Sequence, residues 1–533
     1  MSTYDKELKL KLFYNEPSAD FTKESTRRHF KDAIKEVRSQ LGKTYPLFIN
    51  GNDILTSKTL KSINPNDINE LIGNVCVAER HHAGDAVSSA KEAFASWRKT
   101  KPIDRARFLL KAAEVMRSRI YEFAAWQILE TGKQWDQAYS DVAEAIDFLE
   151  YYAREILKIG KPIHLRSVAG ETNWYLHEPR GVAVVIAPWN FPLAISVGMI
   201  SAAMVTGNTI VYKPSESSSV VGHLLVSVFQ EIGLPAGVFN FLPGYGQEVG
   251  EYLVTNPLVS LIVFTGSLQV GLRILEEAAK VHPHQEQIKK VICEMGGKNA
   301  IIIDSDADLD AAIPAIIASA FGYQGQKCSA CSRLIVLEEI YERIVGRLIQ
   351  AASELKMGPS EDPAYDLGAV INLEAKEKIL KYQDLAVQEG TILFKGTIPS
   401  IDGFYVPLMI VGDVDPGKTI AQEEVFGPLL CIMKAKDFDQ AIEWANSTAY
   451  ALTGGIFSRS PKNLERAKHE LHVGNLYLNR AITGANVERQ PFGGAYMSGT
   501  GTKAGGHDYL LNFMYPRVIT ENSSRQEFST EKS

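Results

Sequence analysis

Cys328 stands in a segment whose residue types favour a reactive thiol. It belongs to Gly322-Tyr-Gln-Gly-Gln-Lys-Cys-Ser-Ala-Cys-Ser-Arg, where two glycines let backbone approach closely and a lysine precedes the sulfur. A nearby cation favours the thiolate, which is the nucleophilic form. Two other interpretations stay open at this point. A lone cysteine is more often a small buried core residue, and the Cys328-x-x-Cys331 spacing also suits a redox or metal pair.

Two further residues could supply a base and an oxyanion donor. Glu294 ends the apolar strand 291–293 and precedes Gly296-Gly297, so its carboxylate can face a cleft and act as a base. Without other observations, however, a glutamate at the end of a strand is more often exposed to water. Asn190 stands between two prolines in Pro188-Trp-Asn-Phe-Pro. A rigidly held amide is a suitable donor to an oxyanion.

Three segments could hold a nucleotide at the ends of strands. Phe264-Thr-Gly-Ser follows a strand and opens a helix at about Ser267, which places helix N-terminal amides beside an anion. Lys213-Pro-Ser-Glu ends another strand, and the carboxylate of Glu216 could accept ribose hydroxyls. Gly244-Tyr-Gly-Gln-Glu-Val-Gly departs by one residue from the dinucleotide-binding fingerprint and is weak evidence by itself.

Residues 181–212 form a charge-free run long enough to span a membrane. Two prolines and the polar Asn190 interrupt it, however, and divide it into strand, helix and strand at 182–186, 193–205 and 209–212. Parallel strands that are covered on both faces are continuous apolar runs of this kind. We therefore expect one buried βαβ unit and no membrane span.

Helices and strands alternate along much of the remaining chain. We expect helices near 28–41, 83–98, 102–132, 134–157 and 309–321. We expect a hairpin turn at Asn50-Gly51 and strands at 163–177, 300–303, 333–337, 391–395, 405–411, 429–433, 454–458 and 474–478. The polar residues from Thr520 onward are expected to fray.

Composition excludes several classes of protein. Of 533 residues, 45% are hydrophobic and 22% charged, so global disorder is excluded. The net charge of −7 argues against nucleic-acid binding as the main function. Five scattered cysteines are too few for a disulfide framework and suggest a reducing, cytoplasmic location. No second CxxC or paired histidines accompany Cys328, so no metal site is expected.

Taken together, seven short motifs resemble the NAD(P)-dependent aldehyde dehydrogenase superfamily over residues 45–515. They are Pro188-Trp-Asn-Phe-Pro, Lys213-Pro-Ser-Glu, Phe264-Thr-Gly-Ser, Glu294-Met-Gly-Gly-Lys-Asn, Gly325-Gln-Lys-Cys, Glu423-Glu-Val-Phe-Gly-Pro and Pro491-Phe-Gly-Gly. Within the superfamily the chain most resembles the members that oxidise L-glutamate γ-semialdehyde in proline and arginine breakdown. That resemblance is carried by the N-terminal extension, Ala143-Glu-Ala-Ile-Asp-Phe-Leu-Glu-Tyr-Tyr-Ala, Cys328-Ser-Ala-Cys-Ser-Arg, Asn479-Arg-Ala-Ile-Thr-Gly-Ala and Arg489-Gln-Pro-Phe-Gly-Gly.

The resemblance implies roles that agree with the residue chemistry. Cys328 would attack the aldehyde, Asn190 would hold the oxyanion, and Glu294 would activate the water that hydrolyses the thioester. It also implies NAD as the cofactor. Its contacts would come from Trp189, Lys213, Glu216, Gly246, Gly266, Ser267, Glu424 and Phe426.

Glutamate semialdehyde carries a carboxylate and an ammonium group away from its aldehyde. The resemblance implies a hydroxyl donor at Ser329 and backbone N–H groups at Gly484-Ala485 for the carboxylate. Phe191 and Phe492 would enclose the aliphatic stem. Glu144 would meet the ammonium, although a glutamate on a helix surface is more often solvated. We further hypothesise that oxidation could join Cys328 to Cys331.

The fold implied is α/β with three parts. Residues 1–157 and 180–293 would form a Rossmann-like NAD-binding domain, and residues 294–510 a second α/β domain that is catalytic. Residues 158–179 and 511–523 would form a protruding β arm for oligomerisation, followed by a flexible tail at 524–533. Long edge strands need a partner, so we expect a homodimer or a multiple of dimers.

Two alternative functions remain. Another semialdehyde dehydrogenase, such as one acting on succinate semialdehyde, would need a carboxylate anchor but no ammonium partner. A non-catalytic scaffold homologue would be expected to lack Cys328, Glu294 or Asn190, and all three are present. A separate proline dehydrogenase could be a partner that passes on the labile substrate.

Overall fold

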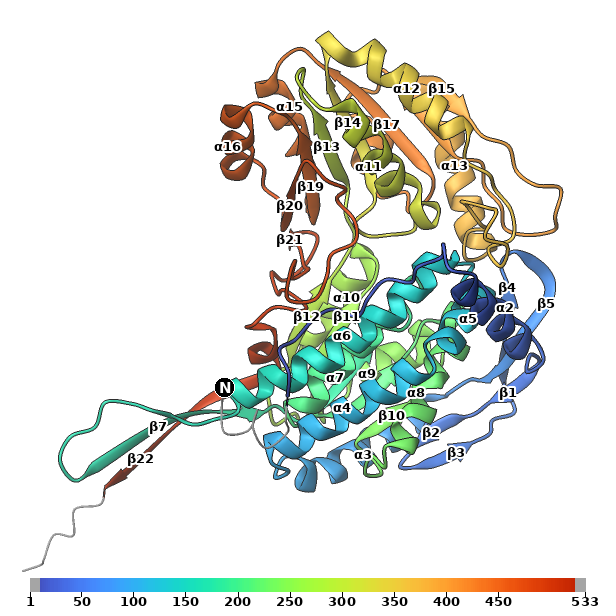
Figure 1. Ribbon diagram of the computed structural model, residues 1–533. Coiled ribbons are helices and arrows are strands. Elements are labelled where there is room, and N and C mark those ends of the chain that lie inside the picture. Colours follow the sequence, from blue (N-terminus) through green and yellow to red (C-terminus); the bar gives the residue numbers. More distant parts are fainter. Residues whose placement is uncertain (1–9, 523–533) are drawn as a thin grey trace, which may run out of the picture.

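The computed structural model describes residues 10–522, and two large sheets dominate it (Figure 1). The first has the order β12–β11–β8–β9–β10–β2–β3, parallel from β12 to β10 and antiparallel from there to β3. Its strands are β2 (Leu47–Ile49), β3 (Asn52–Ile54), β8 (Val182–Ile186), β9 (Thr209–Lys213), β10 (Phe239–Phe241), β11 (Val259–Thr265) and β12 (Lys290–Glu294).

Helices cover both faces of this sheet. They are α2 (Glu24–Arg38), α3 (Arg80–Trp97), α4 (Pro102–Ser118), α5 (Ile120–Thr131), α6 (Trp135–Ile159), α7 (Ala194–Val205), α8 (Ser219–Glu231), α9 (Glu251–Thr255) and α10 (Leu268–Ala279). Alternate residues of β8 face opposite ways. Ala183 and Val185 pack with the layer of α4 to α8, and Val182 and Val184 pack with α3, α9 and α10. The uncharged run of β8 is thus explained by burial on both faces.

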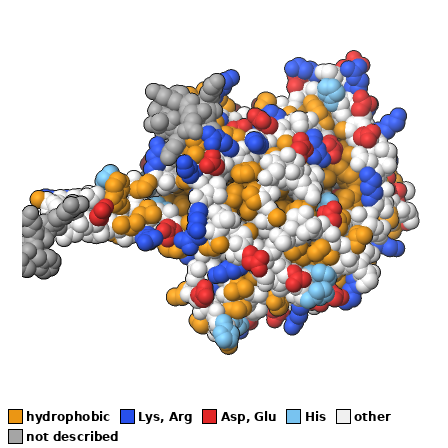
Figure 2. All heavy atoms as spheres, turned by 90° about the horizontal axis from the view of Figure 1, so that it is seen from below, with side chains coloured by type: hydrophobic (Ala, Val, Ile, Leu, Met, Phe, Trp, Pro, Cys, Tyr) orange, Lys and Arg blue, Asp and Glu red, His pale blue; other side chains and the backbone are white. Residues whose placement is uncertain are grey.

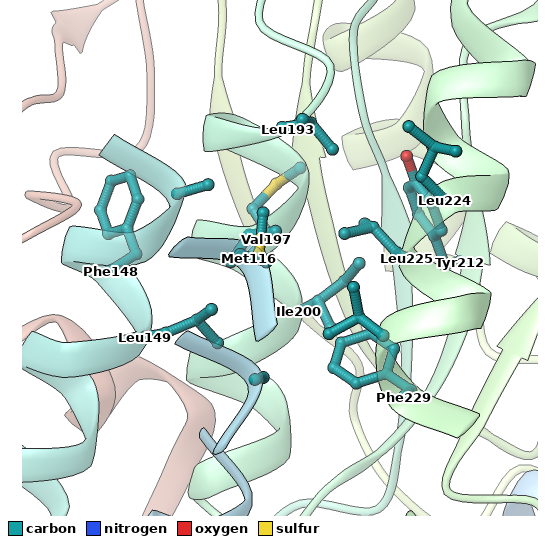
Figure 3. Close-up of a cluster of buried hydrophobic side chains, with 14 of the residues drawn as sticks. Met116, Phe148, Leu149, Leu193, Val197, Ile200, Tyr212, Leu224, Leu225 and Phe229 are labelled. Atoms are coloured by element: carbon teal, nitrogen blue, oxygen red, sulfur yellow. The ribbon is translucent and has the colours of Figure 1, made fainter. Parts of the chain in front are cut away.

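Helices α6, α7 and α8 share one apolar core over the sheet (Figure 3). Each fully buried side chain of this size stabilises the fold by roughly 1.5–3 kcal/mol. The labelled side chains in Figure 3 are Met116, Phe148, Leu149, Leu193, Val197, Ile200, Tyr212, Leu224, Leu225 and Phe229. Because α6 is anchored along this core, its opposite side can hold other segments in fixed positions.

The second sheet has the order β15–β16–β17–β14–β13–β19–β20 and is parallel except for the edge strand β15. Its strands are β13 (Asn299–Ile303), β14 (Cys331–Leu337), β15 (Thr391–Lys395), β16 (Met409–Gly412), β17 (Leu429–Ala435), β19 (Thr453–Phe457) and β20 (Asn475–Leu478). One face is covered by α11 (Leu309–Phe321) and α12 (Tyr341–Ser353). The other is covered by α13 (Leu373–Glu389), α14 (Thr419–Gln422), α15 (Phe438–Ala445) and α16 (Pro461–Glu470).

A narrow arm projects from the body (Figure 1). It consists of β7 (Glu171–Pro179) paired antiparallel with β22 (Met514–Asn522), and of the short β6 (Ile163–His164). Hydrophobic side chains lie along its surface (Figure 2), among them Ile163, 55% exposed, and Val518, 57% exposed. Two smaller sheets are also present. One has the strand order β1 (Lys43–Tyr45), β5 (Asp67–Cys76) and β4 (Thr59–Asn64), and the other pairs β18 (Tyr450–Ala451) with β21 (Ala495–Tyr496).

Most expected elements are confirmed within one to four residues, including the βαβ unit and the β2–β3 hairpin at Asn50-Gly51. The single strand expected at 163–177 is wrong, because that segment divides into β6 and β7, which pair with each other. The single helix expected at 102–132 is also wrong. It divides into α4 and α5 at Arg119, whose backbone leaves the helical region at φ −112° and ψ 20°. Fraying from Thr520 is also wrong as far as Asn522, because β22 stays paired with β7 to that residue. The tail at 524–533 lies outside the described residues. Among residues 10–522, no helix is both long and apolar enough to cross a membrane.

Candidate active site

A tight turn after α11 presents Cys328. Tyr323, Gln324 and Gly325 follow one another in the left-handed backbone region, with φ of 54°, 56° and 69°. A side chain at Gly325 would meet the carbonyl oxygen of Gly427 at 2.6 Å, so this position requires glycine. The Asn299 amide then donates to the Cys328 carbonyl oxygen at 2.7 Å. The turn is therefore fixed on both sides of the sulfur.

Cys328 lines a cavity of about 320 Å³ between the two sheets. The cavity is bounded by the carboxyl ends of β8, β11 and β12 on one side, and by α13 and the segment after α14 on the other. Eight of the predicted catalytic and cofactor residues line it together: Trp189, Asn190, Gly266, Ser267, Glu294, Cys328, Glu424 and Phe426. Residues from both halves of the chain thus meet at one site.

The three remaining predicted cofactor residues form a separate cluster at the carboxyl end of β9. The Lys213 ammonium lies 3.1 Å from a carboxylate oxygen of Glu216, which begins the short helix η1 (Glu216–Ser218). The same oxygen accepts the backbone N–H of Gly246 at 3.1 Å, at the start of the π-helical turn η2 (Gly246–Gly250). None of the three lines the 320 Å³ cavity.

Burial and two carboxylates dominate the electrostatics around Cys328. Burial, then the charges of Glu294 and Glu424, raise the pKa of its thiol well above the ordinary value, while backbone N–H groups at 328 and 329 oppose this. The Cys328 charge acts favourably on the Lys327 ammonium, as the sequence suggested, but burial and the two carboxylates outweigh that attraction at the thiol. The Lys327 ammonium donates to the side chain of Gln137.

Glu294 is a half-buried residue, and its carboxyl oxygen Oε1 is buried without a hydrogen bond in the described part of the chain. Burial first, and the charge of Glu424 second, raise its pKa well above 4.5. Its Oε1 has no partner among the described residues. Glu424 differs, because its Oε1 accepts the backbone N–H of Gly297 at 2.9 Å. An unpartnered carboxylate in the cavity is suited to take a proton from a water molecule.

Asn190 is held rigidly, as its flanking prolines predict. Its Nδ2 donates one hydrogen to the carbonyl oxygen of Gln326 at 3.0 Å, and its side chain is buried. The Gln326 side chain is fixed in turn by the backbone N–H of Ile371. Because an amide nitrogen has two hydrogens, a second one remains for a ligand in the cavity.

None of the six predicted substrate residues lines the 320 Å³ cavity. Ser329 is buried beside Cys328, and Phe492 pairs through its backbone with Ala504. Gly484 has φ +74° in an exposed turn that continues into the half-buried Ala485. Phe191 is half-buried.

Glu144, predicted to meet the ammonium, is not in the solvated position that is commoner for a glutamate on a helix surface. It is only partly exposed on α6, and burial followed by the charges of Asp141 and Asp147 raises its pKa to about 8. The charges of Lys133 and Lys327 oppose that shift.

One pair of functional residues is missed by sequence reasoning. The Lys133 ammonium lies 3.1 Å from an oxygen of Asp141, and both side chains are fully buried. That ammonium also lies 4.2 Å from the ring centroid of Phe191, and the other Asp141 oxygen accepts the N–H of Ala194 at 2.8 Å. The pair therefore fixes the loop that carries Asn190. The sequence offered no signal for this pair, because α6 carries several other charged residues besides Asp141.

Cys331 lies in a different environment from Cys328. It is the first residue of β14, its side chain is buried in the core, and its thiol donates to the Arg333 carbonyl oxygen at 3.4 Å. Burial raises its pKa to about 12. Both thiols are free. No group of three or more metal-ligating side chains comes together within residues 10–522.

The fold and this site define an aldehyde dehydrogenase. The aldehyde dehydrogenase family model matches residues 54–519, and the chain belongs to that family. The chain is 48% identical to the 1-pyrroline-5-carboxylate dehydrogenase of Geobacillus kaustophilus over 509 residues, which are 96% of this chain and 99% of that protein. It is 46% identical over 509 residues to the Bacillus subtilis protein of the same name, with the same coverage.

Two solved structures are also similar to this chain. A 1-pyrroline-5-carboxylate dehydrogenase from Thermus, crystallised with bound NAD, matches with a TM-score of 0.95 and 44% identity, over 96% of this chain and 99% of that one. Proline utilization A from Bdellovibrio bacteriovorus matches with a TM-score of 0.96 and 46% identity. That match covers 98% of this chain but 54% of the longer protein.

Proposed function

We propose that this protein oxidises L-glutamate γ-semialdehyde, the open form of 1-pyrroline-5-carboxylate, to L-glutamate with NAD as the hydride acceptor. The observation that carries the proposal is the convergence of Cys328, Asn190 and Glu294 on one cavity, in a chain 48% identical to a 1-pyrroline-5-carboxylate dehydrogenase. The reaction would form part of proline and arginine breakdown.

Cys328 is the nucleophile in this proposal. Its thiolate attacks the aldehyde carbon and forms a thiohemiacetal. The free amide hydrogen of Asn190 and the backbone N–H of Cys328 stabilise the oxyanion; removing one such donor commonly costs about 10²–10³ in kcat. Loss of hydride from the same carbon leaves a thioester on the sulfur. Glu294 then takes a proton from water, which attacks the thioester and releases L-glutamate.

The site fits a nicotinamide dinucleotide, which would accept the hydride when bound. Glu294 lines the cavity and its buried Oε1 has no partner among the described residues, and Gly266 and Ser267 at the start of α10 line the same space. At Gly296 a Cβ would meet the Glu424 carboxylate at 2.3 Å, so glycine there leaves room for that side chain. Glu424 would hold the nicotinamide ribose, with Phe426 and Trp189 beside it.

The second cluster would hold the adenosine end. Glu216 presents a carboxylate to ribose hydroxyls and would repel a 2′-phosphate, which favours NAD over NADP. Its contacts to Lys213 and to the Gly246 N–H fix its orientation. Because this arrangement uses a lysine–glutamate pair, it does not need the glycine fingerprint, and the off-pattern glycines 244–250 are accounted for.

The substrate's zwitterionic end would be held beyond Cys328. The Gly484 and Ala485 N–H groups and the Ser329 hydroxyl would bind the carboxylate, and Phe191 and Phe492 would enclose the stem. Glu144 would meet the ammonium. A half-buried carboxylate whose pKa is raised to about 8 gains from an adjacent cation.

We also propose the three-part domain division given above, with the arm as the site of pairing between two copies. Exposed apolar residues such as Val518 on the three-stranded arm support this. Val518→Asp should lower the mass measured by light scattering to that of a smaller assembly, and an unchanged mass would contradict the arm's role. A separate proline dehydrogenase as supplier and a cytoplasmic location, in keeping with five free thiols, are further parts of the proposal.

Glu294→Gln tests the proposed chemistry. With 1-pyrroline-5-carboxylate and excess NAD, the variant should form about one NADH per site rapidly and then turn over about 10²–10⁴-fold more slowly than the wild type. The trapped acyl group should be found by mass spectrometry on the peptide that contains Cys328. Steady turnover at the wild-type rate would refute the role of Glu294, and Cys328→Ala is the control without a nucleophile.

A further inference from the structure

The segment ahead of α2 runs along α6 and reaches the loop that carries Gly484 and Ala485 (Figure 1). We call residues 10–16 the strap and residues 483–488 the anchor loop. The Asn15 amide nitrogen donates to Asp147 Oδ2 at 2.9 Å and to the Val487 carbonyl oxygen at 3.0 Å. One side chain thus joins the strap, α6 and the anchor loop.

The strap is held firmly on both sides of Asn15. The Glu16 backbone N–H donates to Asp147 Oδ1 at 2.7 Å, and the Glu16 carboxylate accepts Arg117 at 2.6 Å. On the other side, the Phe13 ring packs edge-on against Tyr151 with centroids 5.3 Å apart. The position of the Asn15 amide is therefore set by the body of the protein.

The anchor loop has other ties besides Asn15: Arg480 donates to the Thr483 and Gly484 carbonyl oxygens at 3.4 Å each. Val487 is buried, and the Glu488 N–H donates to the Gly505 carbonyl oxygen at 3.0 Å. The N–H groups of Gly484 and Ala485 donate to no other group in the part of the chain that the structure describes. The Val487 carbonyl held by Asn15 lies only two residues beyond those free donors.

We infer that Asn15 is a positioning residue for substrate recognition: by holding the Val487 carbonyl, it orients the Gly484 and Ala485 N–H groups toward the substrate's carboxylate. The inference rests on the proposed function. Asn15 lines neither the cavity nor the nucleotide cluster. It acts through the anchor loop, and its other partner, Asp147, acts on the Glu144 carboxyl that would meet the ammonium. Asn15 therefore serves only aldehydes that carry the distant zwitterionic end.

Asn15→Ala tests this with two substrates, 1-pyrroline-5-carboxylate and propanal, which lacks a carboxylate. Loss of a hydrogen bond of about 1 kcal/mol predicts a rise of about fivefold in KM for 1-pyrroline-5-carboxylate, with kcat and both constants for propanal unchanged. Ser18→Ala is the matched control, because Ser18 is exposed and makes no hydrogen bond within residues 10–522. It should equal the wild type on both substrates.

Two results would overturn the inference alone: equal KM values in Asn15→Ala and the wild type, or equal rises for both aldehydes. Failure of the wild type to oxidise 1-pyrroline-5-carboxylate would instead overturn the proposed function, and this inference with it. The outcomes are distinguishable because propanal turnover reports separately on the catalytic centre.

The double variant Asn15→Asp, Asp147→Asn distinguishes two roles for Asn15. One is to position the anchor loop, and the other is only to attach the strap to α6. The pair restores a donor and an acceptor between strap and α6, but residue 15 then has no hydrogen to donate to Val487. KM for 1-pyrroline-5-carboxylate should stay raised although thermal unfolding returns to the wild-type temperature. A return of KM to the wild-type value would show that attachment is all that matters and would overturn the inference.

Discussion

Lys133 and Asp141 form an ion pair of 3.1 Å in which both side chains are completely buried, directly behind the loop that carries Asn190. The Lys133 ammonium faces the Phe191 ring, and Asp141 accepts the backbone N–H of Ala194 at the start of α7. Burial lowers the pKa of Lys133 and raises that of Asp141, while each charge opposes the shift of the other. The position of the Asn190 amide thus depends on a pair that does not line the cavity.

Replacement of Lys133 by Met should therefore destabilise the protein strongly. The Asp141 carboxylate would remain buried without its cation, which costs about 3–5 kcal/mol. Lys436→Met is the matched control, because Lys436 and its partner Asp437 are 69% and 51% exposed and their pairing contributes little. Both variants would be compared with the wild type by urea unfolding. Equal unfolding midpoints for the two variants would contradict the structural role of the buried pair.

The buried carboxyl groups set the pH dependence of turnover. In the proposed mechanism the Cys328 thiol and the Glu294 carboxyl react in their deprotonated forms, and burial raises both pKa values. Turnover should therefore rise with pH through those raised values. Glu424 raises both further, so Glu424→Gln should move the rising limb to lower pH when kcat is measured at saturating NAD. A rising limb of the pH profile that stays in place or moves to higher pH would show that the Glu424 charge does not act on Cys328 and Glu294.

Ser329→Ala addresses the choice of substrate. If the Ser329 hydroxyl binds the carboxylate of glutamate semialdehyde, its removal should lower kcat/KM for 1-pyrroline-5-carboxylate by about tenfold, the effect of a hydrogen bond to a charged group. The same constant for propanal should change little. Steady-state kinetics on both aldehydes would measure these changes. Equal losses of kcat/KM for the two aldehydes would show that Ser329 does not bind the carboxylate.

Sequence patterns predicted the sheets well because burial on both faces leaves a local signature. The strands at 182–186 and 209–213 are continuous apolar runs, and their order follows from βαβ geometry. The break at Arg119 left no signature, because neither glycine nor proline marks it. Its backbone is shaped by packing rather than by local propensity.

The sequence likewise predicted some features of the site and missed others. Motif residues such as Cys328 and Asn190 could be assigned because strand ends and prolines constrain them locally. The charge environment of Cys328 could not, because it depends on Glu424, nearly a hundred residues away, and on the direction that the Lys327 side chain takes. The contacts of Asn15 with Asp147 and Val487 span 132 and 472 residues, beyond the reach of any local pattern.

Comparison of three aldehydes tests the central claim most directly. The purified protein would be given 1-pyrroline-5-carboxylate, succinate semialdehyde and propanal with NAD, and kcat/KM would be taken from NADH formation, with Cys328→Ala as the control. The account predicts the highest kcat/KM for 1-pyrroline-5-carboxylate, L-glutamate formed in equal amount to NADH, and no turnover in the variant. A higher value for succinate semialdehyde or propanal would contradict the proposed substrate and the roles given to Ser329, Gly484 and Ala485.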